Sequence, residues 1–337
     1  MHHAILGRSG IRVSRLCLGA MMFGAQTDEP TAARIIADAR ERGVNFIDTA
    51  DAYAGGRSEE VVGRAIAPHR ADWVLATKLA NRTEAGGANN AGLSRLHIQR
   101  AAEASLKRLG VEAIDVLYWH KEDHATPLEV SVRATADLVR AGKIRHFAVS
   151  NHRAWRIAEI CRLCDQAGID RPVASQPYYS ALDRRAEVEQ LPACAALGLG
   201  VVPYSPLARG VLTGKYAPDA APEAGSRAGR QDRRLMETQW SPDNLRAAAS
   251  IAEHARSRGI EPAAFAVAWV LRNRLIASVI AGPRTEAQWA AYVAALDVRL
   301  GAEDEAAVDA IVTAGHPAAA GRNDPAYPIE GRVAHDG

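Results

Sequence analysis

The amino-acid sequence predicts an α/β protein that folds as a closed (β/α)8 TIM barrel, with an N-terminal β-hairpin and a long loop after the seventh strand. Short apolar segments alternate with segments of helical periodicity along most of the chain. The first seven strand ends follow one another at intervals of about 26 to 42 residues, the length that one βα unit requires. A small or polar residue ends each apolar segment, and these residues are Gly19, Asp48, Lys78, His120, Ser150, Gln176, Tyr204 and, after a longer interval, Ala281.

An open, doubly wound sheet is the alternative that the same alternation allows. Such a sheet usually carries the motif G-x-G-x-x-G directly after its first strand. No predicted strand is followed by this motif, because Gly198-Leu199-Gly200 lacks the third glycine and precedes a strand. Eight strand segments with polar or small residues at their carboxyl ends therefore favour the barrel.

An N-terminal hairpin is expected to precede the barrel. The short apolar runs 5–7 and 11–13 flank Arg8-Ser9-Gly10, a turn that ends in glycine. The first buried strand is expected over residues 16–19. Pro30 then fits the first turn of a helix, a position that tolerates the missing amide.

The remaining elements follow from apolar runs, N-cap residues and glycine stops. We expect strands over residues 44–47, 73–77, 114–119, 144–149, 173–175, 199–203 and 277–280. We expect Ser58 to cap one helix and Ser94 the next, with helices over 94–109, 127–142, 157–167, 188–197, 243–258, 262–272 and 285–296. Residues 217–239 are too long for a simple connection, which favours a loop at the barrel mouth.

The composition is that of an ordinary soluble protein. Of 337 residues, 48% are hydrophobic and 24% are charged, and the formal net charge is +2. This charge is too balanced to favour nucleic acid or an anionic membrane as a partner. No run of 18 apolar residues and no apolar leader occurs, so we expect a soluble, cytoplasmic protein. We expect one domain over residues 1–337, with a core of about 4–312 and a tail over 313–337.

The four cysteines, Cys17, Cys161, Cys164 and Cys194, are too few for a disulfide framework in a chain of this length. Cys161 and Cys164 form a C-x-x-C pair within a helical apolar pattern. A buried apolar pair is favoured there over a metal or redox site, and no metal site is predicted.

The carboxyl ends of barrel strands face one pocket, so Asp48, Lys78 and His120 should converge with Tyr53, which follows Asp48 on a loop. Alone, each residue has an ordinary structural explanation, such as an ion pair or a surface tyrosine. Together they suggest an acid–base group, because a lysine ammonium lowers the pKa of a neighbouring phenol from about 10. Such a group can protonate an oxygen while hydride reaches the carbon, and a nicotinamide must then supply the hydride.

A lyase that uses Lys78 as a Schiff base is an alternative from another reaction class. Asp48 beside Lys78 favours a charged lysine, and so argues against a nucleophilic one.

The chain resembles the aldo-keto reductase superfamily, and more closely its bacterial branch similar to potassium-channel β subunits. The resemblance covers about residues 4–312. It rests on the combination of Asn45-Phe46-Ile47-Asp48-Thr49-Ala50 with Tyr53 and Ser58-Glu59, Ala76-Thr77-Lys78, Asp115 to His120, Val149-Ser150-Asn151, Tyr204-Ser205-Pro206-Leu207 and Gly210-Val211-Leu212-Thr213-Gly214-Lys215-Tyr216.

The resemblance implies an enzyme that uses NADPH, or NADP+ in reverse, to interconvert an aldehyde or ketone and an alcohol. Tyr53 would donate the proton, Lys78 and Asp48 would tune it, and His120 would orient the carbonyl. Ser150, Asn151 and Gln176 would hold the nicotinamide carboxamide, and Tyr204 would stack on its ring. The implied cofactor-binding residues are Gly19, Met21, Asp48, Ser150, Asn151, Gln176, Tyr204, Ser205, Pro206, Leu207, Arg209, Gly210, Lys215, Arg227, Gly282, Arg284 and Gln288.

Several positions depart from the family pattern. Ala281 stands where a proline is usual, Ala291-Tyr292 replace a Glu-Asn pair that contacts adenine in relatives, and the loop after His120 lacks its usual proline. Arg284 still offers a guanidinium fork to a 2′-phosphate, which favours NADPH over NADH.

The expected partner is a small carbonyl or alcohol substrate, with no nucleic acid and no membrane, and a homo-oligomer is compatible with the resemblance. Loops 21–26, 81–92, 121–126 and 217–239 and the tail would determine specificity. The second functional hypothesis is a cofactor-binding regulatory or redox-sensing subunit. Retention of all four catalytic residue types argues against that hypothesis.

Overall fold

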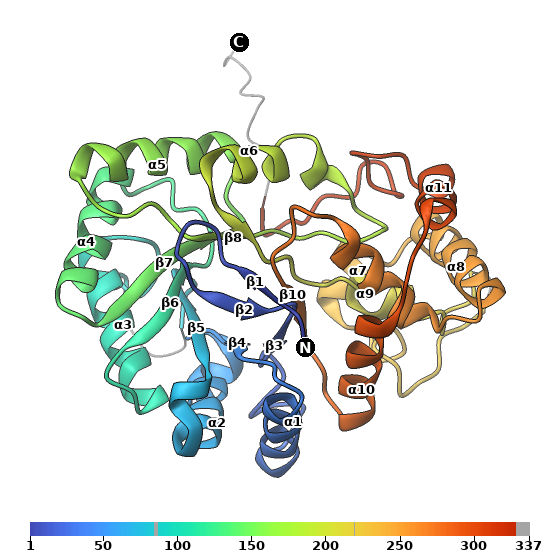
Figure 1. Ribbon diagram of the computed structural model, residues 1–337, viewed down its shortest axis with the longest axis horizontal. Coiled ribbons are helices and arrows are strands. Elements are labelled where there is room, and N and C mark those ends of the chain that lie inside the picture. The colour runs from blue at the N-terminus through green and yellow to red at the C-terminus, as the bar shows by residue number, and fades with distance from the viewer. Residues whose placement is uncertain (84–86, 219, 328–337) are drawn as a thin grey trace.

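The computed structural model describes residues 1–83, 87–218 and 220–327, and it shows a barrel of parallel strands surrounded by helices (Figure 1). The strands lie in the order β10-β3-β4-β5-β6-β7-β8-β9. The barrel closes between its last two strands, because the amide of Ala277 donates to the Val201 carbonyl at 2.9 Å and that of Ile280 to the Pro203 carbonyl at 3.0 Å. The predicted (β/α)8 fold is confirmed. The strands are β3 (Leu16–Gly19), β4 (Phe46–Asp48), β5 (Val74–Leu79), β6 (Ile114–Trp119), β7 (Ile144–Ser150), β8 (Ala174–Gln176), β9 (Gly200–Val201) and β10 (Val279–Ala281).

Helices connect and cover these strands. Ser94 caps α3 as the sequence predicts, because its side chain accepts from the His97 amide. Asp28, which the sequence analysis did not single out, caps α1 by accepting from the Thr31 amide. No helix within the described ranges is long and apolar enough to cross a membrane. The helices are α1 (Glu29–Glu41), α2 (Arg57–Ile66), α3 (Arg95–Leu109), α4 (Leu128–Arg140), α5 (Ala154–Ala167), α6 (Gln190–Leu197), α7 (Arg233–Thr238), α8 (Pro242–Ser257), α9 (Pro262–Arg272), α10 (Glu286–Ala294) and α11 (Ala302–Ile311).

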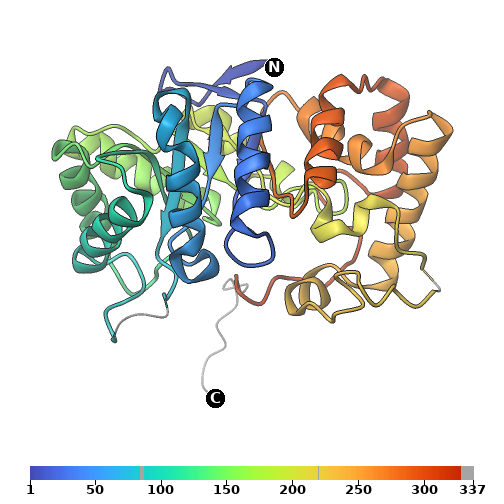
Figure 2. The same ribbon diagram turned by 90° about the horizontal axis from the view of Figure 1, so that it is seen from below.

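The predicted N-terminal hairpin pairs β1 (His3–Ile5) with β2 (Arg12–Ser14) and covers the amino end of the barrel (Figure 2). Leu6 and Val13 of this hairpin pack with side chains inside the barrel. Gly7 allows the close approach, because a Cβ there would lie 2.3 Å from the Val173 carbonyl oxygen. The carboxyl ends of the strands are therefore left as the accessible end.

Two apolar layers hold the fold together. One fills the barrel interior, and the other lies between the strands and the helices. The interior is packed rather than hollow, as is usual for this fold. All four cysteines are buried and unpaired, and Cys161 and Cys164 pack in the apolar layer between strands and helices, as the sequence predicts.

Two predicted elements need correction. Ser58 is not an N-cap: α2 begins earlier, after Gly56, and the Ser58 hydroxyl lies inside the helix, donating to the Ala20 carbonyl at 2.7 Å. The predicted strand 199–203 pairs regularly only over β9, because Pro203 has no amide to donate. The long loop after β9 contains the short helix α7, and α11 was not expected from the sequence.

Candidate active site

Three neighbouring strands bring the predicted acid–base residues together. Asp48, the last residue of β4, lies opposite Ala76 of β5, and Lys78 follows on the same face of that strand. Lys78 is in turn opposite Tyr118 of β6, and His120 follows the end of that strand. The side chains thus meet at the carboxyl end of the barrel, where this fold usually carries its active site.

Lys78 and Asp48 form a buried ion pair. The Nζ of Lys78 donates to Asp48 Oδ1 and to the Thr49 carbonyl oxygen, the latter at 2.8 Å. The Nε2 of Gln176 donates to the other oxygen of Asp48 at 3.1 Å. Burial disfavours the charged ammonium, but Asp48 and Tyr53 hold the pKa of Lys78 above its ordinary value. The lysine is therefore charged at neutral pH.

Tyr53 begins η1 (Tyr53–Gly56), a strained turn between β4 and α2. The next three residues are all left-handed, with φ of 51° at Ala54, 65° at Gly55 and 94° at Gly56. Glycine adopts this conformation freely, whereas alanine does so at a cost. The turn brings the Tyr53 hydroxyl to 3.2 Å from the Nζ of Lys78, which can donate a hydrogen bond to it.

The acidity of Tyr53 differs from the sequence-based expectation. Burial raises the pKa of the phenol above its ordinary value; Lys78 lowers it, and Asp48 raises it further. The expected net lowering of the pKa is wrong, because the half-buried phenol is poorly hydrated at the cavity wall and Asp48 partly neutralises the ammonium. Lys78 thus reduces the cost of a buried phenolate without making the resting phenol unusually acidic.

His120 is placed as a neutral hydrogen-bond donor. Burial lowers the pKa of its imidazole well below the ordinary value, and Lys78 and Lys121 lower it further. The amide nitrogen of Asn81 lies 2.9 Å from Nδ1 of His120, and since an amide nitrogen only donates, Nδ1 accepts. The proton is then on Nε2. The ring packs edge-on against Tyr53, with centroids 5.7 Å apart.

A cavity of about 440 Å³ lies over these side chains, within the size range of ligand pockets. Asp48, Tyr53 and His120 line it, whereas Lys78 lies behind Tyr53 and is fully buried. Pro206 is the one predicted cofactor residue outside its lining. The predicted cofactor residues that do line it are Gly19, Met21, Asp48, Ser150, Asn151, Gln176, Tyr204, Ser205, Leu207, Arg209, Gly210, Lys215, Arg227, Gly282, Arg284 and Gln288.

A chain of hydrogen bonds fixes the polar wall beside the acid–base group. The hydroxyl of Tyr204 donates to Oδ1 of Asn151 at 2.9 Å, and Nδ2 of Asn151 donates to the His120 carbonyl at 2.9 Å. The Ser150 hydroxyl donates to the Gln176 carbonyl at 2.9 Å. The wall presents amide and hydroxyl groups held by these hydrogen bonds, which suits an amide-bearing ligand.

The other end of the cavity gathers positive charge. Burial lowers the pKa of Arg284, and the nearby guanidinium groups of Arg230 and Arg227 lower it further. Arg227 pairs with Asp232 at 3.0 Å, and Lys215 lines the same cavity. Cations that repel one another at a cavity wall fit an anionic ligand, so these residues suit the phosphates of a dinucleotide.

The structure adds cavity residues that the sequence did not single out. Among them, Asn81 follows β5 in a predicted specificity loop, part of which (84–86) lies outside the described residues. Tyr327 of the tail also lines the cavity, and Arg234 of α7 donates to Asp324 through both terminal nitrogens. The described part of the tail therefore reaches the barrel mouth, whereas residues 328–337 lie outside the description, as does residue 219 of the long loop.

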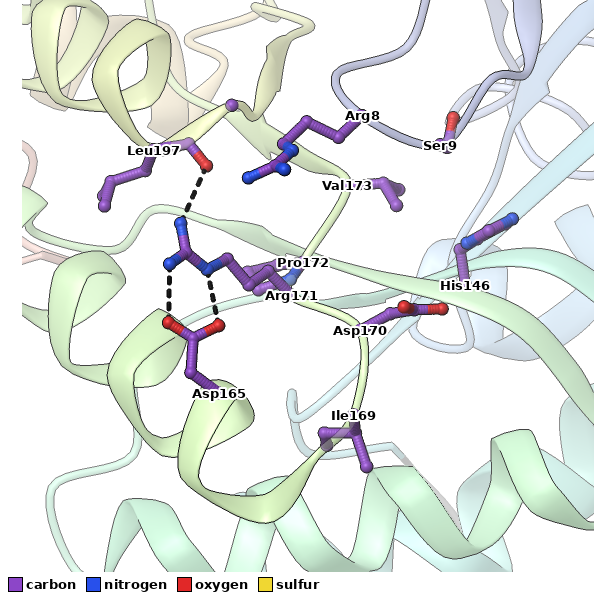
Figure 3. A pocket seen from close by; sticks show the side chains of 11 residues that line it. Arg8, Ser9, His146, Asp165, Ile169, Asp170, Arg171, Pro172, Val173 and Leu197 are labelled. Carbon is purple, nitrogen blue, oxygen red and sulfur yellow. Dashed lines mark hydrogen bonds and ion pairs between the residues drawn. The ribbon is translucent and has the colours of Figure 1, made fainter.

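A second cavity, of about 390 Å³, lies at the amino end of the barrel, between the hairpin turn and the loop before β8 (Figure 3). Arg171 donates to both carboxylate oxygens of Asp165, from Nε at 2.8 Å, and to the Leu197 carbonyl at 3.4 Å (Figure 3). Both charged side chains are substantially exposed. This cavity lacks the acid–base group, and its ion pair joins the last turn of α5 to the segment that follows it.

Comparisons with known proteins show which proteins this chain is similar to. The profile described as "Aldo/keto reductase family" matches residues 15–313. A probable voltage-gated potassium channel subunit beta of Arabidopsis thaliana is 38% identical over 303 residues, which cover 88% of this chain and 92% of the relative.

Two further relatives carry enzyme names. An uncharacterized oxidoreductase, YrpG, of Bacillus subtilis is 36% identical over 314 residues, covering 90% of this chain and 93% of the relative. Versiconal hemiacetal acetate reductase of Aspergillus parasiticus is 31% identical over 329 residues, covering 90% and 95%. The similarity thus extends over nearly the whole of each relative.

Proposed function

The chain belongs to the aldo/keto reductase family, and from this premise we propose that it reduces an aldehyde or ketone to an alcohol with NADPH, reversibly. Family membership makes it an oxidoreductase of the aldo-keto class. We further propose a cytoplasmic location and a small carbonyl or alcohol as substrate. The observation that carries the proposal is the Tyr53 hydroxyl, which lines the cavity while lying 3.2 Å from the buried Lys78 ammonium.

In this proposal Tyr53 donates its proton to the carbonyl oxygen of the substrate. The charged Lys78 stabilises the phenolate that remains, and Asp48 holds Lys78 in position. The Nε2–H of His120 donates to the same carbonyl oxygen and orients it. A neutral imidazole suits this role, because it polarises the carbonyl without competing with Tyr53 as an acid.

A nicotinamide bound in the cavity would supply the hydride. Its amide would meet the wall formed by Ser150, Asn151 and Gln176, with Tyr204 beside its ring. Lys215 and Arg227 would bind the pyrophosphate, and Arg284 the 2′-phosphate. The repulsion between the Arg284 guanidinium and those of Arg230 and Arg227 supports an anion there, and hence NADPH over NADH.

A panel of aldehydes, ketones and alcohols tests the proposal, with turnover followed by NADPH absorbance and NADH assayed alongside. We expect reduction of at least one carbonyl class, with one NADPH oxidised for each alcohol formed and a higher kcat/KM with NADPH. Cofactor binding without turnover of any panel member would contradict the proposal.

A regulatory subunit is the second candidate, because three similar proteins are named as probable or putative potassium channel β subunits. In that case cofactor would bind, turnover would be slow, and a stable complex with a membrane protein would form. Affinity purification of the full chain in mild detergent, beside the kinetic panel, separates the two candidates. Fast turnover and no membrane partner would favour the enzyme.

A further inference from the structure

Asp51 is a buried acid in the turn that carries Tyr53, and the proposed mechanism does not use it. Its side chain is 2% exposed. Neither carboxylate oxygen accepts a hydrogen bond of good geometry among the described residues, and the adjacent Ala52 amide is the one backbone donor that acts on the group. Its backbone amide donates to the Lys78 carbonyl at 3.0 Å, which fixes Asp51 against the strand that bears the lysine.

The cations near Asp51 are already bonded to other carboxylates, so they do not compensate for a further negative charge on Asp51. Glu59 of α2 is fully buried, accepts from the Thr77 hydroxyl and accepts from Nε of Arg108 at 2.6 Å. The Arg108 guanidinium from α3 is thus already bonded to Glu59. Lys78 of β5, the only other nearby cation in the described part of the site, is paired with Asp48.

An ionised carboxylate buried without a bonded cation is costly, and such a group takes up a proton instead. Two carboxylates that share one guanidinium cannot both be well compensated. Burial, with Glu59 next in importance, raises the pKa of Asp51 to about 7, while Arg108, the Ala52 amide and Lys78 oppose this shift. Burial without a bonded cation therefore favours the protonated carboxyl, in the same direction as the raised pKa of Asp51.

We propose that Asp51 is a positioning residue that tunes the acidity of Tyr53: the protonated carboxyl leaves the phenol a better acid, and ionisation makes it a poorer one. Its effect on turnover rests on the proposed reductase function. When Asp51 ionises, its proton passes to bulk water, and the new negative charge lies close enough to raise the pKa of Tyr53. The free energy of forming the Tyr53 phenolate during reduction is then higher, so kcat for reduction should fall as the pH rises through about 7.

The first test follows Tyr53 without any substrate. The ultraviolet difference titration between the wild type and Tyr53→Phe reports the pKa of the phenol. The same difference in an Asp51→Asn background should give a lower pKa, because no carboxylate remains to oppose the phenolate. Asp72→Asn, at an exposed aspartate, is the control and should change nothing. An unchanged Tyr53 pKa in Asp51→Asn would overturn the proposal.

The second test follows the Asp51 proton and turnover together. Infrared difference spectra between the wild type and Asp51→Asn should show a protonated carboxyl that disappears near pH 7, and its absence would overturn the proposal. For reduction, kcat should fall about tenfold across the same range in the wild type and stay flat in Asp51→Asn. In Arg108→Gln the fall in kcat should occur at a higher pH, because the cation that lowers the pKa of Asp51 is gone. In Arg108→Lys, which keeps the cation, the fall in kcat should occur at nearly the same pH as in the wild type.

These readouts separate two failures. If the infrared and phenol titrations behave as expected but no carbonyl is reduced, the proposed function fails and the tuning by Asp51 stands. If carbonyls are reduced but the fall in kcat persists in Asp51→Asn, the proposed function stands and the inference about Asp51 fails.

Discussion

The two ends of the barrel differ in backbone strain and in how deeply charged side chains are buried. At the amino end, left-handed residues that precede strands are glycines, such as Gly110, Gly142 and Gly168. At the carboxyl end, residues other than glycine adopt this conformation in the loops after the strands, including Ala54, Asn151 and others. Among the described residues, the strained left-handed positions that are not glycine lie in loops at the carboxyl end of the barrel, and such strain is typical of functional sites.

Charge shows the same contrast. Arg171 and Asp165 at the amino end form an exposed, bidentate pair. The carboxyl end has a fully buried Lys78–Asp48 pair and a group of arginines that repel one another. The amino end therefore carries an ion pair that water screens, whereas the carboxyl end holds charges that are buried and depend on one another.

The largest expected difference between the two ends is in the effect of breaking one ion pair at each of them. Lys78→Met leaves Asp48 buried without its cation, so the free energy of unfolding should fall by about 3 to 5 kcal/mol. Turnover should also be lost. Arg171→Met removes an exposed partner and should change neither property measurably. Urea unfolding and kinetic assays on both variants check this, and equal losses of stability would contradict the contrast.

A smaller, selective effect is expected from Arg284→Gln. Loss of a charged hydrogen-bond donor should weaken NADPH binding by about 10- to 100-fold and leave NADH binding nearly unchanged. Fluorescence titration with each cofactor measures this, and Arg274→Gln, on an exposed position before β10, is the matched control. If both cofactors weakened equally, Arg284 would not be the 2′-phosphate ligand.

The smallest effects come from exchanging alanine and glycine at left-handed positions. Ala54→Gly removes strain beside Tyr53 and should stabilise the fold by about 1 kcal/mol, while kcat falls because the turn loosens. Gly168→Ala, at the C-cap of α5, should destabilise by about 1 kcal/mol and leave kcat unchanged. Thermal unfolding and steady-state kinetics give both quantities. A rise in kcat for Ala54→Gly would show that the strain serves no purpose.

The fold and the central residues could be predicted because they depend on local order along the chain. Strand ends at regular intervals predict a barrel, and the barrel brings Asp48, Lys78 and His120 together. The position of Tyr327 could not be predicted, because it depends on the path of a tail fixed by the Arg234–Asp324 pair. The Tyr53 pKa could not be predicted either, since it depends on how burial and neighbouring charges balance in three dimensions.

The proposed role of Asp51 could not be predicted from the sequence for the same reason. From the sequence it is one acid in the loop after Asp48. Its burial and its lack of a partner appear only when α2 and α3 pack beneath that loop.

The most direct test of the central claim measures turnover and NADPH affinity of Tyr53→Phe side by side. Loss of the proton donor should lower kcat for carbonyl reduction by about 10²- to 10⁴-fold. The Kd for NADPH, from quenching of protein fluorescence, should stay within a factor of about two, since Phe keeps the ring that lines the cavity. A variant that binds NADPH and retains the wild-type rate would show that the proton comes from another group.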